Sequence, residues 1–200
     1  GLGQNAEALA CLQPNHLQMP GPLVLDADAL NLLAAHPGWD AYLHKRAAYG
    51  MVTILTPHEA EAGRLLGCHY AEIHANRPQA ALRLAEKYAA TVVLKGCGSI
   101  VASENGELFI NPTGNPALAT GGSGDVLTGL IIGLLAQIGL RSKDTESRAD
   151  YLAKGLAAVL AAVYIHGQAA QDLGFSRGLA AGELIPAART ALQRLENTMI

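Results

Sequence analysis

Thr120-Gly-Gly-Ser-Gly-Asp-Val-Leu-Thr-Gly-Leu130 joins a glycine-rich turn to an apolar run, and this run predicts a helix over 125–137. A helix that begins directly after glycines has free backbone N–H groups at the positive end of its dipole. Such an end suits a phosphate, or an oxyanion that develops during a reaction. Asp125 lies at the same end, where it is stabilised as a carboxylate and available as a base or a metal contact.

The same stretch also fits an ordinary helix start. Ser123 or Asp125 could cap the helix with a side-chain oxygen, and the glycines would then only form the turn. The elements around the stretch decide between the two interpretations.

Strands and helices alternate along the chain before this turn. Apolar runs predict strands over 23–25, 51–55 and 91–94. Helical spacing and end signals predict helices over 28–35, 58–66 and 76–90. Asn105-Gly106 predicts a hairpin between 100–103 and 107–110. Further helices are predicted over 125–137, 145–171 and 181–196, with a charged surface loop over 141–148. This order is typical of one α/β domain, with a mostly parallel central sheet flanked by helices and an antiparallel hairpin.

Polar clusters follow the predicted strands at the points where they end. They cover residues 26–31, 56–58, 95–99 and 111–125. Because ligands of parallel sheets bind beyond the carboxyl ends of the strands, we expect the four clusters to converge on one cleft.

Composition excludes several classes of protein. The 200 residues suit one domain with a sizeable core, and half of them are hydrophobic. A net charge of −3 without a basic face argues against nucleic acid as a partner. Three cysteines without close spacing favour reduced thiols in the cytoplasm over a disulfide scaffold or a zinc site. The longest apolar stretch, 126–135, is too short to span a membrane, and Gly129 and Gly133 within it predict close helix packing.

Five motifs, in this order, resemble the ADP/ATP-dependent NAD(P)H-hydrate dehydratase family of the ribokinase-like superfamily. They are Gly-Leu-Gly at 1–3, Leu-Asp-Ala-Asp-Ala-Leu-Asn at 25–31, Leu-Thr-Pro-His-x-x-Glu at 55–61, Val-Val-Leu-Lys-Gly-x-Gly-Ser at 92–99, and Gly-Asn-Pro-x-Leu-Ala-Thr-Gly-Gly-Ser-Gly-Asp-Val-Leu-Thr-Gly at 114–129. The chain departs from the common family pattern at Glu59, Ala60 and Ala117. The motif at 1–3 lies well inside family domains, so we expect N-terminal elements of this domain to be missing.

The resemblance implies a repair reaction. The family restores NADH or NADPH from hydrated forms, and a nucleotide is thought to phosphorylate the extra hydroxyl before the ring nitrogen expels phosphate. Asp125 would be the catalytic base, and the N–H groups around Gly122–Gly124 would form the anion hole. Nucleotide binding is expected at Lys95, Gly96, Cys97, Gly98, Ser99, Gly122 and Gly124, with ADP or ATP and Mg²⁺ as cofactors. The alternative for Lys95 is a solvated side chain in a polar turn.

The resemblance also implies a substrate side of the cleft, formed by Gly3, Asn31, His58 and Asp125. His58 has a helix-capping role as its alternative, and Asn31 a purely structural one. Asp26 is interpreted as structural, Asp28 as the cap of the following helix, and Glu61 as a partner of its own loop. The other histidines (His16, His36, His44, His69, His74, His166) show no metal-ligand spacing and are interpreted as surface or packing residues.

Further expectations follow from the family alone. They are hydrated NADH or NADPH as substrate, a homotetramer, a cytoplasmic location, and an epimerase present as an N-terminal domain or a separate protein. Two other functions stay open: a kinase of the same superfamily that acts on a vitamin precursor or sugar, and a nucleotide-binding module without turnover.

Overall fold

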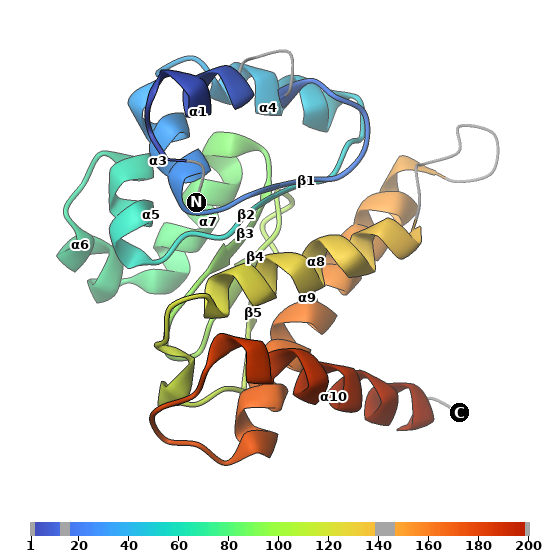
Figure 1. The fold of residues 1–200 in the computed structure, drawn as a ribbon. Coiled ribbons are helices and arrows are strands. Elements are labelled where there is room, and N and C mark those ends of the chain that lie inside the picture. Colours follow the sequence, from blue (N-terminus) through green and yellow to red (C-terminus); the bar gives the residue numbers. More distant parts are fainter. Residues whose placement is uncertain (1–2, 13–16, 139–146, 199–200) are drawn as a thin grey trace.

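The computed structural model describes residues 3–12, 17–138 and 147–198, and these form three layers with a sheet between helices (Figure 1). The strands are β1 (Leu23–Leu25), β2 (Thr53–Leu55), β3 (Thr91–Leu94), β4 (Ile100–Ala102) and β5 (Leu108–Ile110). The helices are α1 (Ala6–Cys11), α3 (Asp28–Ala35), α4 (Asp40–Ala48), α5 (Glu59–Leu66), α6 (Tyr70–Ala75), α7 (Arg77–Tyr88), α8 (Ser123–Ile138), α9 (Arg148–Leu173) and α10 (Leu184–Thr198), with short 3₁₀ turns at Pro116–Leu118 and Ala181–Glu183.

The sheet has the order β1-β2-β3-β4-β5 in the described part of the chain. β1, β2 and β3 are parallel, and β4 and β5 continue the sheet as an antiparallel hairpin. This confirms the predicted α/β class and the hairpin at Asn105-Gly106. The predicted loop over 141–148 falls mostly outside the described residues.

Alternating side chains of the strands build two apolar layers. Leu55, Val92 and Leu94 face a core that includes side chains of α3, α4, α5 and α7. Ile54 and Val93 face the opposite core, with side chains of α8 and α9. This period of two is what places a buried strand between two layers of helices.

Helix ends follow the local signals that predicted them. Asn76 caps α7 by accepting from the N–H of Gln79, and Pro78 lies in its first turn. Gly67 ends α5 in the left-handed conformation with φ +68°. These ends lie within one or two residues of the predicted boundaries.

Helix α9 is long and apolar enough to cross a membrane on length and composition alone. In the structure, 44% of its most apolar segment is buried. It packs on the sheet beside α8 and, at its other end, against α10 (Figure 1). Packing against these elements accounts for the buried part of this apolar segment.

The segment between β5 and α8 is fastened to α9. Thr113 Oγ1 donates to Tyr164 O at 2.9 Å, and Asn115 Nδ2 donates to Ala170 O at 2.8 Å. A Cβ at Gly167 would lie 2.3 Å from Thr113 Oγ1, so only glycine permits this approach. The segment thus reaches the glycine-rich turn along a fixed path.

The prediction for Gly129 and Gly133 is wrong among the described residues, because a Cβ at either position would meet no atom within 4 Å. Close approach to a neighbouring segment occurs instead on α9, where Gly155 faces Val52 and Gly167 faces Thr113. Spacing in the sequence does not reveal which glycine meets a neighbouring element.

Candidate active site

The carboxyl ends of the parallel strands are joined by backbone hydrogen bonds. Thr56 N–H donates to Leu25 O at 3.1 Å, and Lys95 N–H donates to Pro57 O at 2.8 Å. The polar residues that follow β1, β2 and β3 therefore begin at one edge of the sheet, as expected from a parallel arrangement.

Lys95 lies at the centre of this edge. Its Nζ is 2.8 Å from Asp26 Oδ1 and 4.0 Å from Glu61 Oε2, and the lysine side chain is only 21% exposed. Asp26 Oδ2 accepts from Thr128 Oγ1 of α8 at 3.2 Å. The solvated alternative for Lys95 is thus not what the structure shows. Asp26 is the partner that holds the ammonium group at the sheet edge.

The first turn of α8 meets this ion pair. A Cβ at Gly124 would lie 3.6 Å from Asp26 Oδ2 and 3.6 Å from Lys95 Nζ. Gly122 has φ +88°, and a Cβ there would lie 3.0 Å from Ala181 Cβ. The glycines therefore allow the turn to approach the lysine and the start of the C-terminal helices.

Free backbone donors are concentrated in this turn. Ser123 N–H and Val126 N–H donate to Thr120 O and Gly122 O, but the N–H groups of Gly122, Gly124 and Asp125 have no acceptor in the described part of the chain. Together with the helix dipole, these N–H groups form a cluster of donors suited to an anion, beside the Lys95–Asp26 ion pair.

Asp125 is the third residue of α8 and is exposed. Within the described residues its carboxylate has no hydrogen bond and no ion pair. Neither Asp125 nor Ser123 caps α8 with its side chain, which argues against the ordinary helix-cap interpretation. The carboxylate is therefore free to contact a ligand.

His166 of α9 contacts the backbone at the start of α8. Its Nε2 lies 3.0 Å from Ser123 O and must be the donor, since a carbonyl only accepts. Burial lowers the pKa of His166, and the charge of Lys95 acts in the same direction, against the opposing effect of the bond to Ser123. The sequence indicated only a surface or packing residue. A buried, neutral His166 instead anchors the first residue of α8.

The segment 95–99 forms a tight turn after β3. Gly96 has φ +150° and Gly98 has φ +63°, and Ser99 Oγ donates to Gly96 O at 3.3 Å. Cys97 is exposed. The glycines let the backbone follow a path that other residues rarely adopt, next to the Lys95 side chain.

His58 caps α5. Its Nδ1 accepts from the N–H groups of Ala60 and Glu61 at 3.1 and 3.3 Å, and Glu61 Oε2 accepts from His58 N–H at 2.8 Å. Because Nδ1 accepts, the ring proton of the neutral imidazole is on Nε2. The side chain is 51% exposed, so capping does not hide it from a ligand. Glu61 is the predicted partner of its own loop.

The capping prediction for Asp28 is wrong. Ala27, with φ 50°, is the N-cap of α3 and makes no side-chain cap bond. Asp28 Oδ2 instead accepts from Gly3 N–H at 2.9 Å, which lowers the pKa of Asp28, and Gln4 adds a second bond. Gly3, with φ +77°, is thereby held beside the polar cluster after β1.

Asn31 Oδ1 accepts from Arg64 Nη1 at 2.9 Å, a partner that the sequence did not indicate.

Metal-binding geometry is limited in the described residues, where no group of three or more His, Cys, Asp or Glu could hold an ion. Magnesium commonly binds through nucleotide phosphates and one or two carboxylates, with water in its other positions. A magnesium ion that is held by nucleotide phosphates and water therefore needs no such group of protein ligands at this site.

The other described histidines have structural partners. His36 stacks on Trp39, His44 contacts Lys87 O, His69 caps α6, and His74 pairs with Glu59. His16 lies outside the described residues.

A cavity of about 860 Å³ lies at the opposite edge of the sheet, beside Thr53, Thr91, Glu104 and Arg148. It contains none of the predicted site residues and is separate from this site.

The three-layer α/β fold is that of ribokinase-like proteins: a ribokinase-like superfamily protein from Enterococcus faecalis superimposes with a TM-score of 0.66 at 25% identity, over 96% of this chain and 60% of that one. The family model for NAD(P)H-hydrate dehydratase matches residues 1–192, and the chain belongs to this family. An ADP-dependent (S)-NAD(P)H-hydrate dehydratase from Neisseria meningitidis is 41% identical over 100% of this chain and 63% of its own length.

Other similar proteins carry the same family description. A bifunctional NAD(P)H-hydrate repair enzyme from Coxiella burnetii is 40% identical over 93% of this chain and 34% of its own length. The ADP/ATP-dependent NAD(P)H-hydrate dehydratase of Bacillus subtilis, co-crystallised with ATP and Mg²⁺, superimposes with a TM-score of 0.73 at 32% identity, over 97% of this chain and 62% of that one. The chain thus spans less than two thirds of the length of these relatives.

Proposed function

We propose that this protein dehydrates hydrated NADH and NADPH in an ADP- or ATP-dependent reaction. The observation that carries the proposal is the set of free N–H groups at Gly122, Gly124 and Asp125, next to the Lys95 ammonium group. This set offers a developing phosphoryl group both hydrogen-bond donors and positive charge. Family membership selects hydrated NAD(P)H as the acceptor of that group.

The steps follow from the chemistry of the substrate. The exposed Asp125 carboxylate takes the proton of the substrate hydroxyl, and the hydroxyl oxygen attacks the terminal phosphorus of the nucleotide, whose bond to the bridging oxygen breaks. The electron pair of the ring nitrogen then expels the phosphorylated oxygen as phosphate. Loss of a ring proton to water restores the double bond. ADP gives AMP in this scheme, and ATP gives ADP.

The residues divide between the two ligands. Lys95, Gly96, Cys97, Gly98, Ser99, Gly122 and Gly124 bind the nucleotide, whose phosphates carry Mg²⁺ into the site. Gly3, Asn31 and His58 contact the hydrated dinucleotide. His58 is well suited because its half-exposed ring carries the proton on Nε2 and can donate to an amide oxygen or hydroxyl.

A turnover assay on the full-length natural protein tests the function. Hydrated NADPH is mixed with ADP or ATP and Mg²⁺, and the return of NADPH absorbance is followed together with phosphate release. Equal amounts of NADPH and phosphate support the dehydratase. Phosphorylation of a vitamin precursor or sugar without NADPH formation indicates the kinase, and ADP binding without turnover indicates a non-catalytic module. The relative rates with ADP and ATP identify the preferred nucleotide.

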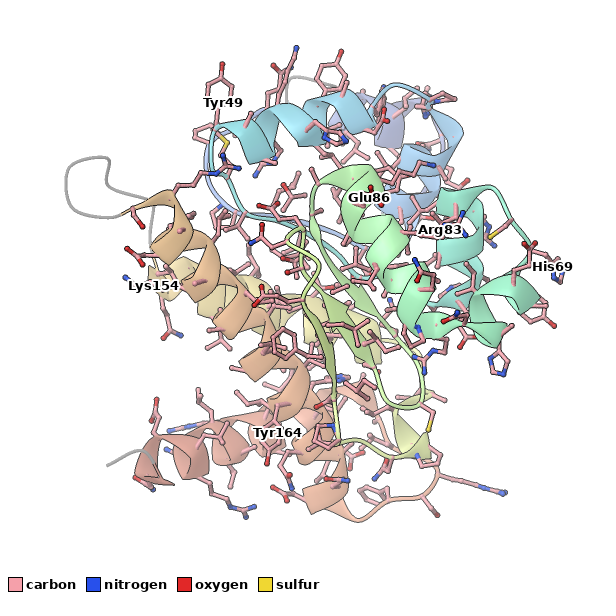
Figure 2. All side chains as sticks on the ribbon, turned by 180° about the vertical axis from the view of Figure 1, so that it is seen from behind. Tyr49, His69, Arg83, Glu86, Lys154 and Tyr164 are labelled. Atoms are coloured by element: carbon pink, nitrogen blue, oxygen red, sulfur yellow. The ribbon has the colours of Figure 1, made fainter. Side chains whose placement is uncertain are left out.

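Nucleotide binding is expected to raise the thermal midpoint. At about 100 times its Kd, ADP stabilises the folded state by about 2.7 kcal/mol, which corresponds to about 5–10 °C for a chain of this size. Lys95→Ala should reduce the ADP-induced shift measured against its own ligand-free midpoint. Lys154→Ala, an exposed lysine on α9 (Figure 2), should keep the full shift. Absence of a shift at millimolar ADP with Mg²⁺ would count against the nucleotide site.

His58→Ala is expected to weaken binding of hydrated NADPH without weakening binding of ADP. The apparent constant for hydrated NADPH should rise about tenfold, the equivalent of one hydrogen bond, while the Kd for ADP stays unchanged. His69→Ala is the matched control, because His69 caps α6 with the same reciprocal bonds and makes no predicted ligand contact (Figure 2). Each variant should lose about 1 kcal/mol of stability from its cap. Equal loss of affinity for both ligands would show that His58 shapes the whole cleft.

The remaining expectations are parts of the same proposal. We place the protein in the cytoplasm, as a homotetramer, with an epimerase as an additional domain or a separate partner. We also propose that further N-terminal elements complete the domain. Exposed Cys11 and Cys97 without disulfide partners are compatible with a reducing compartment. Size-exclusion chromatography with light scattering measures the oligomeric state.

A further inference from the structure

We propose that Arg77 is the positioning residue that fixes the backbone of segment 95–99 in the shape a nucleotide needs. This inference rests on the proposed function for its effect on ADP affinity, but not for its effect on the segment itself. Arg77 is the first residue of α7, and its side chain is only 15% exposed.

The guanidinium group of Arg77 binds two backbone carbonyls, one directly before segment 95–99 and one in its middle. Nη2 donates to Leu94 O, the last carbonyl of β3, at 3.3 Å, and Nη1 donates to Cys97 O at 2.5 Å. The planar fork of arginine reaches two carbonyls at once, which the single ammonium group of a lysine cannot reproduce. Arg77 therefore sets the distance between the start and the middle of the segment.

Gly96 lies directly against the guanidinium group of Arg77. A Cβ at Gly96 would lie 2.7 Å from Arg77 Nη2 and 3.1 Å from its Cζ, and the glycine has φ +150°. The glycine therefore serves two purposes: it permits the unusual backbone angle and lets the guanidinium group lie against the turn. The family motif that contains Gly96 gives no sign of this second purpose.

A carboxylate holds the arginine in place. Glu59 Oε1 lies 3.1 Å from Arg77 Nε, an ionic contact in which the N–H is not aligned for a hydrogen bond. Glu59 is the first residue of α5 and follows His58 directly. The same ion pair therefore joins the loop of the proposed substrate histidine to the proposed nucleotide segment.

Arg77→Lys tests the positioning role because it keeps the positive charge and removes the fork. Backbone order parameters from ¹⁵N relaxation of ligand-free protein should fall at Gly96, Cys97 and Gly98 from the rigid range near about 0.85 toward about 0.6. The Kd for ADP should rise at least about tenfold, while the apparent constant for hydrated NADPH changes less than about threefold. Arg83→Lys, on the exposed side of the same helix (Figure 2), is the matched control and should change none of these values.

Gly96→Ala examines the same contact from the other side. If Arg77→Lys folds poorly, Gly96→Ala in the wild-type background should by itself lower the order parameters of Cys97 and Gly98. Its methyl group must displace the guanidinium group, so the loss of ADP affinity should be smaller in the Arg77→Lys background than in the wild type. Unchanged order parameters in Arg77→Lys, or strictly additive effects of the two substitutions, overturn the proposal. If the order parameters fall in Arg77→Lys but the wild-type protein binds no ADP, the positioning role of Arg77 is supported and the proposed function is rejected.

Discussion

Asp125→Asn is expected to lower the turnover of hydrated NADPH by about 10²–10⁴-fold, the usual contribution of a general base. Asparagine preserves the size and the oxygen of the side chain but cannot accept the substrate proton. The carboxylate is exposed and has no partner in the described part of the chain, so its replacement breaks no structural contact. The turnover assay described above, run on the full-length natural protein, measures the effect.

Binding and stability separate a catalytic role from a structural one. The Kd for ADP should stay constant or fall, because removal of a negative charge beside the phosphates relieves repulsion. Stability should change by no more than about 1 kcal/mol. Asp150→Asn is the matched control, since Asp150 is also the third residue of its helix but lies on α9, where Ser147 is its hydrogen-bond partner. Near-complete turnover in Asp125→Asn would mean that the proton goes to another group.

Arg46→Ala is expected to lower the free energy of unfolding by about 3–5 kcal/mol, the largest stability effect that we predict. Arg46 is only 2% exposed, and burial lowers its pKa. It donates to Thr53 Oγ1 and to a set of backbone carbonyls: Leu17, Met19, Gly21 and Val52. Truncation leaves Leu17 O and Gly21 O without this donor, while Val52 O keeps the bond from Leu23 N–H, and it opens a cavity beside β2.

Urea denaturation followed by circular dichroism measures this loss. Lys45→Ala is the control on the same helix, because Lys45 is exposed and, among the described residues, its ammonium group lies only over the Tyr42 ring, 5.6 Å from the centroid. It should change stability by less than about 1 kcal/mol. A loss below about 1 kcal/mol for Arg46→Ala would show that water replaces the guanidinium group at the freed carbonyls.

The predicted elements were most accurate where local chemistry is strong. Asn76, Pro78 and Gly67 marked helix ends, and Asn105-Gly106 marked the hairpin, because each residue acts within three or four positions of itself. Helix α4 was missed, since its sequence is largely polar and its buried residues include a charged one. A buried arginine follows no hydrophobic pattern.

The site was predicted only in part, because most of its contacts are long-range. The order of the motifs placed Lys95, Gly124 and His58 at one edge of the sheet. It did not show that Asp26 binds Lys95 across 69 positions, that Arg77 holds Cys97 O across 20, or that His166 supports Ser123 across 43. Asp28 was assigned to its own helix, although its partner is Gly3, 25 residues earlier.

The sequence by itself determined the α/β class, the hairpin, the family and the positions of the candidate catalytic and nucleotide-binding residues. These depend on periodicity, on turn chemistry and on motifs that are contiguous in the chain. Only the tertiary structure decided which charges pair, which glycines admit a neighbouring element and which polar side chains are buried. Gly129 and Gly167 illustrate the difference: both are helical glycines, but a Cβ would meet nothing at the first and Thr113 at the second. Such contacts are set by the packing of elements that are remote in sequence, and no local pattern records them.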